Sequence, residues 1–167
     1  AMATQFQVAH SSLVRGAGLL AASPYRCAEG SVREALGRCM KGEPEIPVAQ
    51  LVEQTRQLAR DGRIDDTAGL EGDRVWLFHG SADPYVQTKV TDALEAYYQA
   101  FVAQADLARV ELAGASHTFP TADVTTGRCD VPEAPFLGNC GLDGARALLA
   151  HVYGELAPGA AAREAGL

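Results

Sequence analysis

The stretch that decides the fold of this chain is Leu77-Phe78-His79-Gly80-Ser81-Ala82-Asp83-Pro84-Tyr85-Val86. It overlaps a short apolar run, residues 74–78, whose β-prone side chains are typical of a strand buried on both faces of a parallel sheet. Gly80 ends this run, and Asp83 follows on the turn. Side chains just beyond the carboxyl end of a parallel strand lie at the edge of the sheet where ligands bind. Asp83 is therefore a candidate site residue.

A second motif further along the chain has the same character: Gly114-Ala115-Ser116-His117-Thr118-Phe119-Pro120. Between the two motifs, residues 88–105 carry apolar side chains at helical spacing, and residues 109–113 form another β-prone run. This strand, helix and strand order predicts a parallel crossover. Asp83 and His117 are then expected at the same edge of the sheet, each on a loop that follows a strand.

The chemistry of the two residues indicates an acid–base pair. An imidazole accepts and returns a proton near neutral pH, and a buried carboxylate fixes its tautomer and stabilises the imidazolium. In α/β-hydrolases the chain order is Ser, then Asp or Glu, then His, so Asp83 and His117 are the expected last two members of such a triad. Each motif alone is weak, since an Asp in a turn is more often a turn former.

The nucleophile of such a triad is not found in the chain. None of the serines lies in the Gly-x-Ser-x-Gly pattern of a nucleophile elbow. Residues 2–10 have the character of a helix already under way, without an N-cap residue, and residues 14–22 follow as a small-residue strand. We therefore expect the chain to begin a few residues beyond the nucleophile, with the serine and the oxyanion hole upstream of it.

The order of these motifs resembles the secreted poly(3-hydroxybutyrate) and polyhydroxyalkanoate depolymerases over almost the whole chain. The segments that carry the resemblance are residues 2–3 and 8–11, Gly16-Ala17-Gly18, Ser23-Pro24-Tyr25-Arg26-Cys27-Ala28, His79-Gly80-Ser81-Ala82-Asp83, Gly114-Ala115-Ser116-His117-Thr118-Phe119-Pro120-Thr121 and Asn139-Cys140-Gly141-Leu142-Asp143-Gly144-Ala145. The last block, which continues to Gly154, is the most specific to this family.

The resemblance implies an α/β fold, the C-terminal part of an α/β-hydrolase with a parallel sheet flanked by helices. It implies a serine esterase that hydrolyses short-chain 3-hydroxyacid polyester through an acyl-enzyme, with Asp83 and His117 as catalytic residues. The partners expected are the ester substrate and the N-terminal half of the enzyme, which carries the serine, so the chain alone is expected to be inactive. Tyr25, Phe119 and Phe136 fall on loops at the catalytic edge and are candidate substrate-binding residues, although buried loop anchors would look the same.

Two other functions fit the same residues. One is a serine hydrolase of this fold that acts on a feruloyl or acetyl ester. The other is a non-catalytic binding domain that kept the fold and lost the nucleophile.

Composition excludes several other classes of protein. The chain has 167 residues, 47% of them hydrophobic and 21% charged, which is enough for a real core. A net charge of −7 and the absence of a basic cluster exclude a nucleic-acid partner. The sequence contains no run of 18 apolar residues, the length that would indicate a membrane span. No cofactor and no metal site is expected.

The four cysteines, Cys27, Cys39, Cys129 and Cys140, allow three disulfide connectivities. We favour the local pairs, Cys27 with Cys39 and Cys129 with Cys140, because each closes a short loop. The alternative is metal binding, but the spacings are far from Cys-x-x-Cys and no histidine lies at ligand distance in the sequence. Disulfides indicate an oxidising compartment, so a secreted or periplasmic protein is expected. The second bridge would pin the long loop after His117, which has few helical signals.

The rest of the chain predicts a single catalytic domain over residues 1–156, followed by a tail or linker over residues 157–167. Helices are expected over residues 29–40, 48–60 and 143–156. Trp76, inside a central strand, is expected in the core.

Overall fold

The structure is a computed structural model that describes residues 2–157. Its centre is a parallel sheet of three strands, β1 (Gly16–Leu20), β2 (Arg74–Gly80) and β3 (Leu107–Leu112), in the order β1-β2-β3. Gly16 lies opposite Arg74 in the first pair, and Gly80 lies opposite Leu112 in the second. The predicted parallel α/β architecture is confirmed. Because β2 and β3 run in the same direction, the loops that follow them leave the sheet at one edge.

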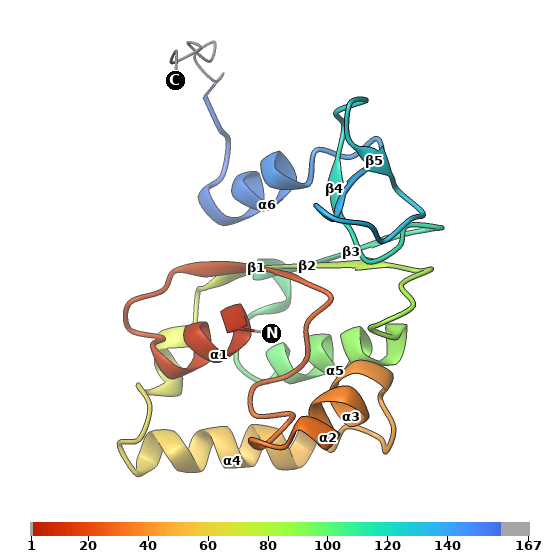
Figure 1. Cartoon of the computed structure of the whole chain (residues 1–167). Helices are drawn as coiled ribbons and strands as arrows, with labels where there is room; N and C mark the ends of the chain where they lie inside the picture. The colour runs from red at the N-terminus through yellow and green to blue at the C-terminus, as the bar shows by residue number, and fades with distance from the viewer. Residues whose placement is uncertain (1, 158–167) are drawn as a thin grey trace, which may run out of the picture.

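Helices cover one face of this sheet (Figure 1). α1 (Met2–Ala9) and α5 (Thr88–Tyr98) lie against the strands, and α4 (Val48–Arg60) packs on α5. The side chains of β2 alternate, so that Val75 and Leu77 point into the larger core on this side. Tyr97 and Tyr98 of α5 are fully buried in the same core. This hydrophobic layer fixes the crossover between β2 and β3.

The other face is covered by α6 (Gly144–Tyr153) and a second, small parallel sheet made of β4 (Phe119–Thr121), β6 (Leu137–Asn139) and β5 (Gly127–Arg128). Trp76 and Phe78 of β2 point to this side and are both 2% exposed, as expected for Trp76. Gly18 of β1 makes room for α6, since a Cβ atom there would lie 1.8 Å from a methyl carbon of Leu148.

Several element boundaries differ from the predictions. The helix expected over residues 88–105 ends at Tyr98, and the chain then turns so that Phe101 and Val102 are buried, before a 3₁₀ turn, η2 (Gln104–Asp106). The helix expected over residues 29–40 is two short helices, α2 (Val32–Leu36) and α3 (Arg38–Lys41), because Gly37 has the non-helical angles φ −88° and ψ −87°. The loop predicted between α4 and β2 contains a 3₁₀ turn, η1 (Thr67–Leu70).

The helix over residues 48–60 is found with the predicted bounds. The last helix begins at Gly144, after Asp143, whose side chain accepts a hydrogen bond from the Arg146 N–H and caps it. The predicted tail lies almost entirely outside the described residues. No helix within residues 2–157 has the length and the apolar character that a bilayer span needs.

Candidate catalytic site

Asp83 and His117 meet at the edge of the sheet. Asp83 lies on the loop after β2, His117 lies on the turn after β3, and His117 Nδ1 is 2.7 Å from Asp83 Oδ2. The Asp83 side chain is 1% exposed, whereas that of His117 is 36% exposed. The carboxylate accepts a hydrogen bond from the Nδ1–H group, which leaves Nε2 as the ring nitrogen without a proton in the neutral imidazole.

The second oxygen of Asp83 fixes the orientation of its carboxylate. Oδ1 accepts hydrogen bonds from the backbone N–H groups of Tyr85, at 2.8 Å, and Val86, at 2.9 Å. These bonds close the turn after β2 onto its own carboxylate and hold Oδ2 towards His117. The loop's own backbone therefore orients the carboxylate of Asp83.

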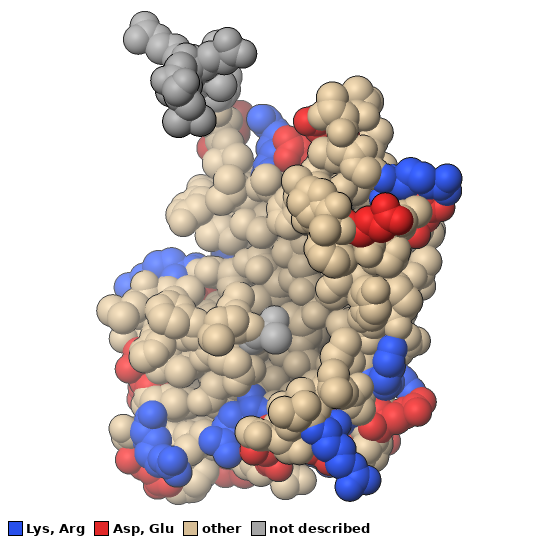
Figure 2. Space-filling model, viewed as in Figure 1, with Lys and Arg blue, Asp and Glu red and all other residues tan. Residues whose placement is uncertain are grey.

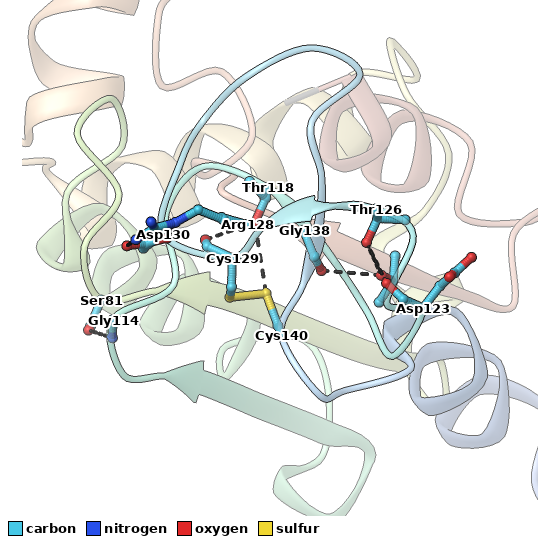
Figure 3. The surroundings of a disulfide bond; sticks show 11 residues. Ser81, Gly114, Thr118, Asp123, Thr126, Arg128, Cys129, Asp130, Gly138 and Cys140 are labelled. Carbon is cyan, nitrogen blue, oxygen red and sulfur yellow. Dashed lines mark hydrogen bonds and ion pairs between the residues drawn. A yellow bond between two sulfur atoms is a disulfide. The ribbon is translucent and has the colours of Figure 1, made fainter.

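The two loops are also joined to each other. The Ala82 N–H donates to the Ala115 carbonyl at 2.9 Å, and the Gly114 N–H donates to Ser81 Oγ at 2.9 Å (Figure 3). Gly80 allows this close approach, because a Cβ atom there would lie 2.4 Å from the Ala115 carbonyl oxygen. These contacts set the distance between the carboxylate and the imidazole.

Of the four histidines, all of them among the described residues, His117 alone lines the cavity at this edge. His79 is buried beneath the loop, with its Nε2 atom 3.1 Å from the hydroxyl of Thr88. Burial lowers the pKa of His79, which keeps the ring neutral. His151 lies 2.9 Å from the Asp106 carbonyl oxygen, and His10 packs against Phe6.

The cavity beside His117 has a volume of about 460 Å³ and is lined mainly by apolar side chains. Two of the three predicted substrate-binding residues, Phe119 and Phe136, are in its wall. Tyr25 is not brought to this cavity: it is 8% exposed and belongs to the core on the helical face. The reason is the path of the chain, which leaves β1 through Ala21 and passes to the helical side of the sheet.

The two disulfides have the predicted pairing, Cys27 with Cys39 and Cys129 with Cys140. The second links the residue after β5 to the residue after β6 and lies close to Thr118 (Figure 3). The carbonyl of Cys129 accepts the Ser116 N–H at 2.9 Å, and the carbonyl of Phe136 accepts the Phe119 N–H at 2.7 Å. The bridge therefore holds the small sheet against the turn that carries His117.

Tyr85 is a neighbour of the site that the sequence analysis missed. Its ring centroid is 5.3 Å from that of His117, with the two planes at 88°. Its position two residues after Asp83 was the one signal in the sequence that placed it near the site. The contact with His117 itself depends on how the two loops meet in space.

Ser116 is the serine that lines this cavity within the described part of the chain, but its hydroxyl is not hydrogen-bonded to the imidazole. No serine hydroxyl of residues 2–157 forms a hydrogen bond with His117; Ser81 accepts from Gly114, and Ser31 caps α2. No group of three or more His, Cys, Asp or Glu side chains in this range has an arrangement that would hold a metal ion.

No protein-family model matches the chain. The chain is 41% identical over 156 residues to a poly(3-hydroxybutyrate) depolymerase of Delftia acidovorans, covering 93% of this chain and 31% of the relative. It is 33% identical over 161 residues to a polyhydroxybutyrate depolymerase of Talaromyces funiculosus, covering 93% of this chain and 45% of the relative.

Solved structures give the same relationship. The crystal structure of PHB depolymerase from Penicillium funiculosum matches 99% of this chain with a TM-score of 0.82 and 28% identity, and the match covers 50% of that chain. A serine-to-alanine PHB depolymerase complexed with an R3HB trimer matches 93% of this chain, again with a TM-score of 0.82 and 28% identity, over 48% of its own length. The chain thus spans about a third to a half of the length of these relatives. By sequence and by fold, the chain is similar to one part of these poly(3-hydroxybutyrate) depolymerases.

Proposed function

We propose that the chain is part of a serine esterase that hydrolyses short-chain polyhydroxyalkanoate, either 3-hydroxybutyrate polyester or its oligomers. The observation that carries this proposal is the Asp83–His117 pair, which joins a buried carboxylate to an imidazole at the edge of an apolar cavity. The nucleophile of the proposed enzyme is a serine outside residues 2–157, so the 167-residue chain alone is expected to be inactive.

In the proposed reaction, His117 acts first as a base. Its Nε2 takes the proton of the serine hydroxyl as the serine oxygen attacks the ester carbonyl, and Asp83 stabilises the imidazolium. The tetrahedral intermediate then collapses, the ester C–O bond breaks, and His117 returns the proton to the leaving alkoxide. Water then attacks the acyl-enzyme, and His117 again acts as base by taking a proton from it. The bond to the serine oxygen breaks, His117 gives this proton to the serine oxygen, and the hydroxyacid is released.

The proposed substrate agrees with the chemistry of the cavity. An aliphatic polyester presents methyl and methylene groups with few polar atoms, and the wall offers Phe119, Phe136 and Leu137 beside the catalytic pair. One structural relative was solved with an R3HB trimer, which has the same repeating unit. The two disulfides support a secreted or periplasmic enzyme, where such bonds persist.

The proposal is tested in a chimera in which this chain replaces the 156 homologous residues of the Delftia acidovorans depolymerase. With a soluble 3-hydroxybutyrate oligomer as substrate, we expect His117→Ala to lower kcat by about 10⁴-fold or more, because nothing else accepts the serine proton. For Asp83→Asn we expect a loss of kcat that is about ten- to a hundredfold smaller. The imidazole stays in place in this variant, but it loses the preferred tautomer and the negative charge that stabilises the imidazolium.

His151→Ala is the matched control, and we expect it to keep near-wild-type rates. Near-full activity of His117→Ala would contradict the triad assignment. A marked preference for feruloyl or acetyl esters over the 3-hydroxybutyrate oligomer would replace the proposed substrate with the alternative one. Folded chimeras that bind the oligomer without any turnover would favour a binding domain.

A further inference from the structure

We infer that Tyr85 is a positioning residue, one that holds the His117 imidazole in place against Asp83. Its importance for catalysis rests on the proposed function. Tyr85 contacts both members of the pair: its backbone N–H donates to Asp83 Oδ1 at 2.8 Å, and its ring lies edge-to-face with the His117 ring at a centroid distance of 5.3 Å. One residue therefore links the orientation of the carboxylate to that of the imidazole.

The loop that carries Tyr85 is anchored on both sides of it. The carbonyl of Pro84 accepts a hydrogen bond from Lys41 Nζ at 2.7 Å, and the Gln87 N–H donates to the Met40 carbonyl at 2.9 Å. Both partners belong to α3. The Tyr85 ring thus starts from a fixed backbone and restricts a histidine whose side chain is otherwise 36% exposed.

A second ring completes the surroundings of His117. Phe136 lies at a centroid distance of 6.4 Å and also meets the imidazole edge-to-face. Its backbone has φ +61°, a conformation that costs free energy for a residue with a side chain and that clusters at functional sites. Phe136 comes from the loop before β6, so two independent loops each bring an aromatic ring to the same imidazole.

The roles of the two rings differ because their positions differ. Phe136 lines the cavity beside His117, whereas Tyr85 does not. Tyr85 is 42% exposed, and its hydroxyl forms no hydrogen bond with any other residue of the described range. The contact with His117 is therefore made by the ring and needs no hydroxyl, and a substrate in the cavity would touch Phe136 but not Tyr85.

The test compares Tyr85→Leu, Tyr85→Phe and Phe136→Leu in the chimera with the Delftia acidovorans depolymerase. For Tyr85→Leu we expect kcat to fall by about three- to tenfold, the range of an edge-to-face aromatic contact, with KM unchanged. Tyr85→Phe restores kcat, and Phe136→Leu also raises KM because it removes part of the cavity wall. Tyr153→Leu, which replaces an exposed tyrosine of α6 that is 73% accessible, is the matched control without effect.

The second readout does not depend on turnover. The His117 Nδ1 proton, followed by NMR, should exchange with water several-fold faster in Tyr85→Leu than in the wild type or in Tyr85→Phe. Unchanged exchange in Tyr85→Leu, or an effect on KM alone, would overturn the positioning role. A chimera without esterase activity would overturn the proposed function, while the exchange rates would still decide the role of Tyr85.

Discussion

Gly80 lies where the loop after β2 passes the turn that carries His117. A Cβ atom at this position would lie 2.4 Å from the Ala115 carbonyl oxygen and 2.6 Å from that of Ser116. Both obstacles are backbone atoms, which cannot rotate away as a side chain does. At the scale of single residues, the geometry of the Asp83–His117 pair thus depends on a glycine that takes no part in the chemistry.

We therefore expect Gly80→Ala to lower kcat by up to about 100-fold, since a displacement of about 1 Å in a catalytic group costs that much. The measurement is steady-state kinetics in the chimera, with circular dichroism to show that the fold is kept. Gly127→Ala, whose Cβ atom would first meet the Leu137 carbonyl oxygen at 3.2 Å, is the control. Wild-type kcat in Gly80→Ala would mean that the two loops are not held as tightly as this contact indicates.

At the scale of elements, the small sheet is the part that most needs a covalent link. Its strands have two or three residues each, too few to bury a core of their own. The Cys129–Cys140 bridge closes this segment at a sequence separation of 11. Through the Cys129 carbonyl, the bridge also fixes the Ser116 N–H next to His117.

Replacing Cys129 and Cys140 together by alanine should lower the free energy of unfolding by roughly 3 kcal/mol, the loop-entropy value for a ring of this size. It should also lower kcat/KM by about tenfold or more, because the wall of the cavity and the His117 turn lose their common anchor. Denaturant unfolding and steady-state kinetics measure the two effects.

The control replaces Cys27 and Cys39, which are separated by 12 residues in sequence. A similar loss of stability without the loss of activity is expected there. Equal losses of activity in both double variants would show that the second bridge acts on stability alone.

At the scale of the whole molecule, the two edges of the main sheet differ. β3 carries Arg109, which pairs with Asp92, Glu95 and Glu111 at 2.7–2.8 Å, and such charges discourage a further strand. β1 is Gly-Ala-Gly-Leu-Leu, without a charge. Figure 2 shows the face of the molecule on which α1 begins. Uncharged side chains cover the middle of this face, and Lys, Arg, Asp and Glu lie towards its margins. Met2 and Phe6 of α1 are 79% and 53% exposed.

This asymmetry predicts that the β1 edge needs cover from a further segment, as the proposed function also requires. The 167-residue chain alone should self-associate in sedimentation experiments, and its thermal midpoint should lie at least about 5 °C below that of the same chain within the chimera, as expected for about 2 kcal/mol of lost stabilisation. A sharp, cooperative transition of the monomeric chain at the chimera's midpoint would contradict this prediction.

Local patterns in the sequence determined the main sheet and the pairing of Asp83 with His117. The apolar runs before Asp83 and His117 are long enough to indicate strands, and parallel strands put the loops that follow them at one edge. The bounds of α4 were also predictable, since its apolar face repeats over thirteen residues. The cysteine spacing similarly indicated which sulfurs pair.

Only the tertiary structure decided the rest. The strands of the small sheet have two or three residues, too few to show the alternation of apolar and polar side chains by which a strand is recognised, so the loop after His117 carried no signal for them. Tyr25 was expected at the cavity and lies in the core, and Tyr85 was overlooked and contacts His117. Both outcomes depend on the path of loops between elements, and that path is set by packing between residues far apart in the chain, which no local pattern records.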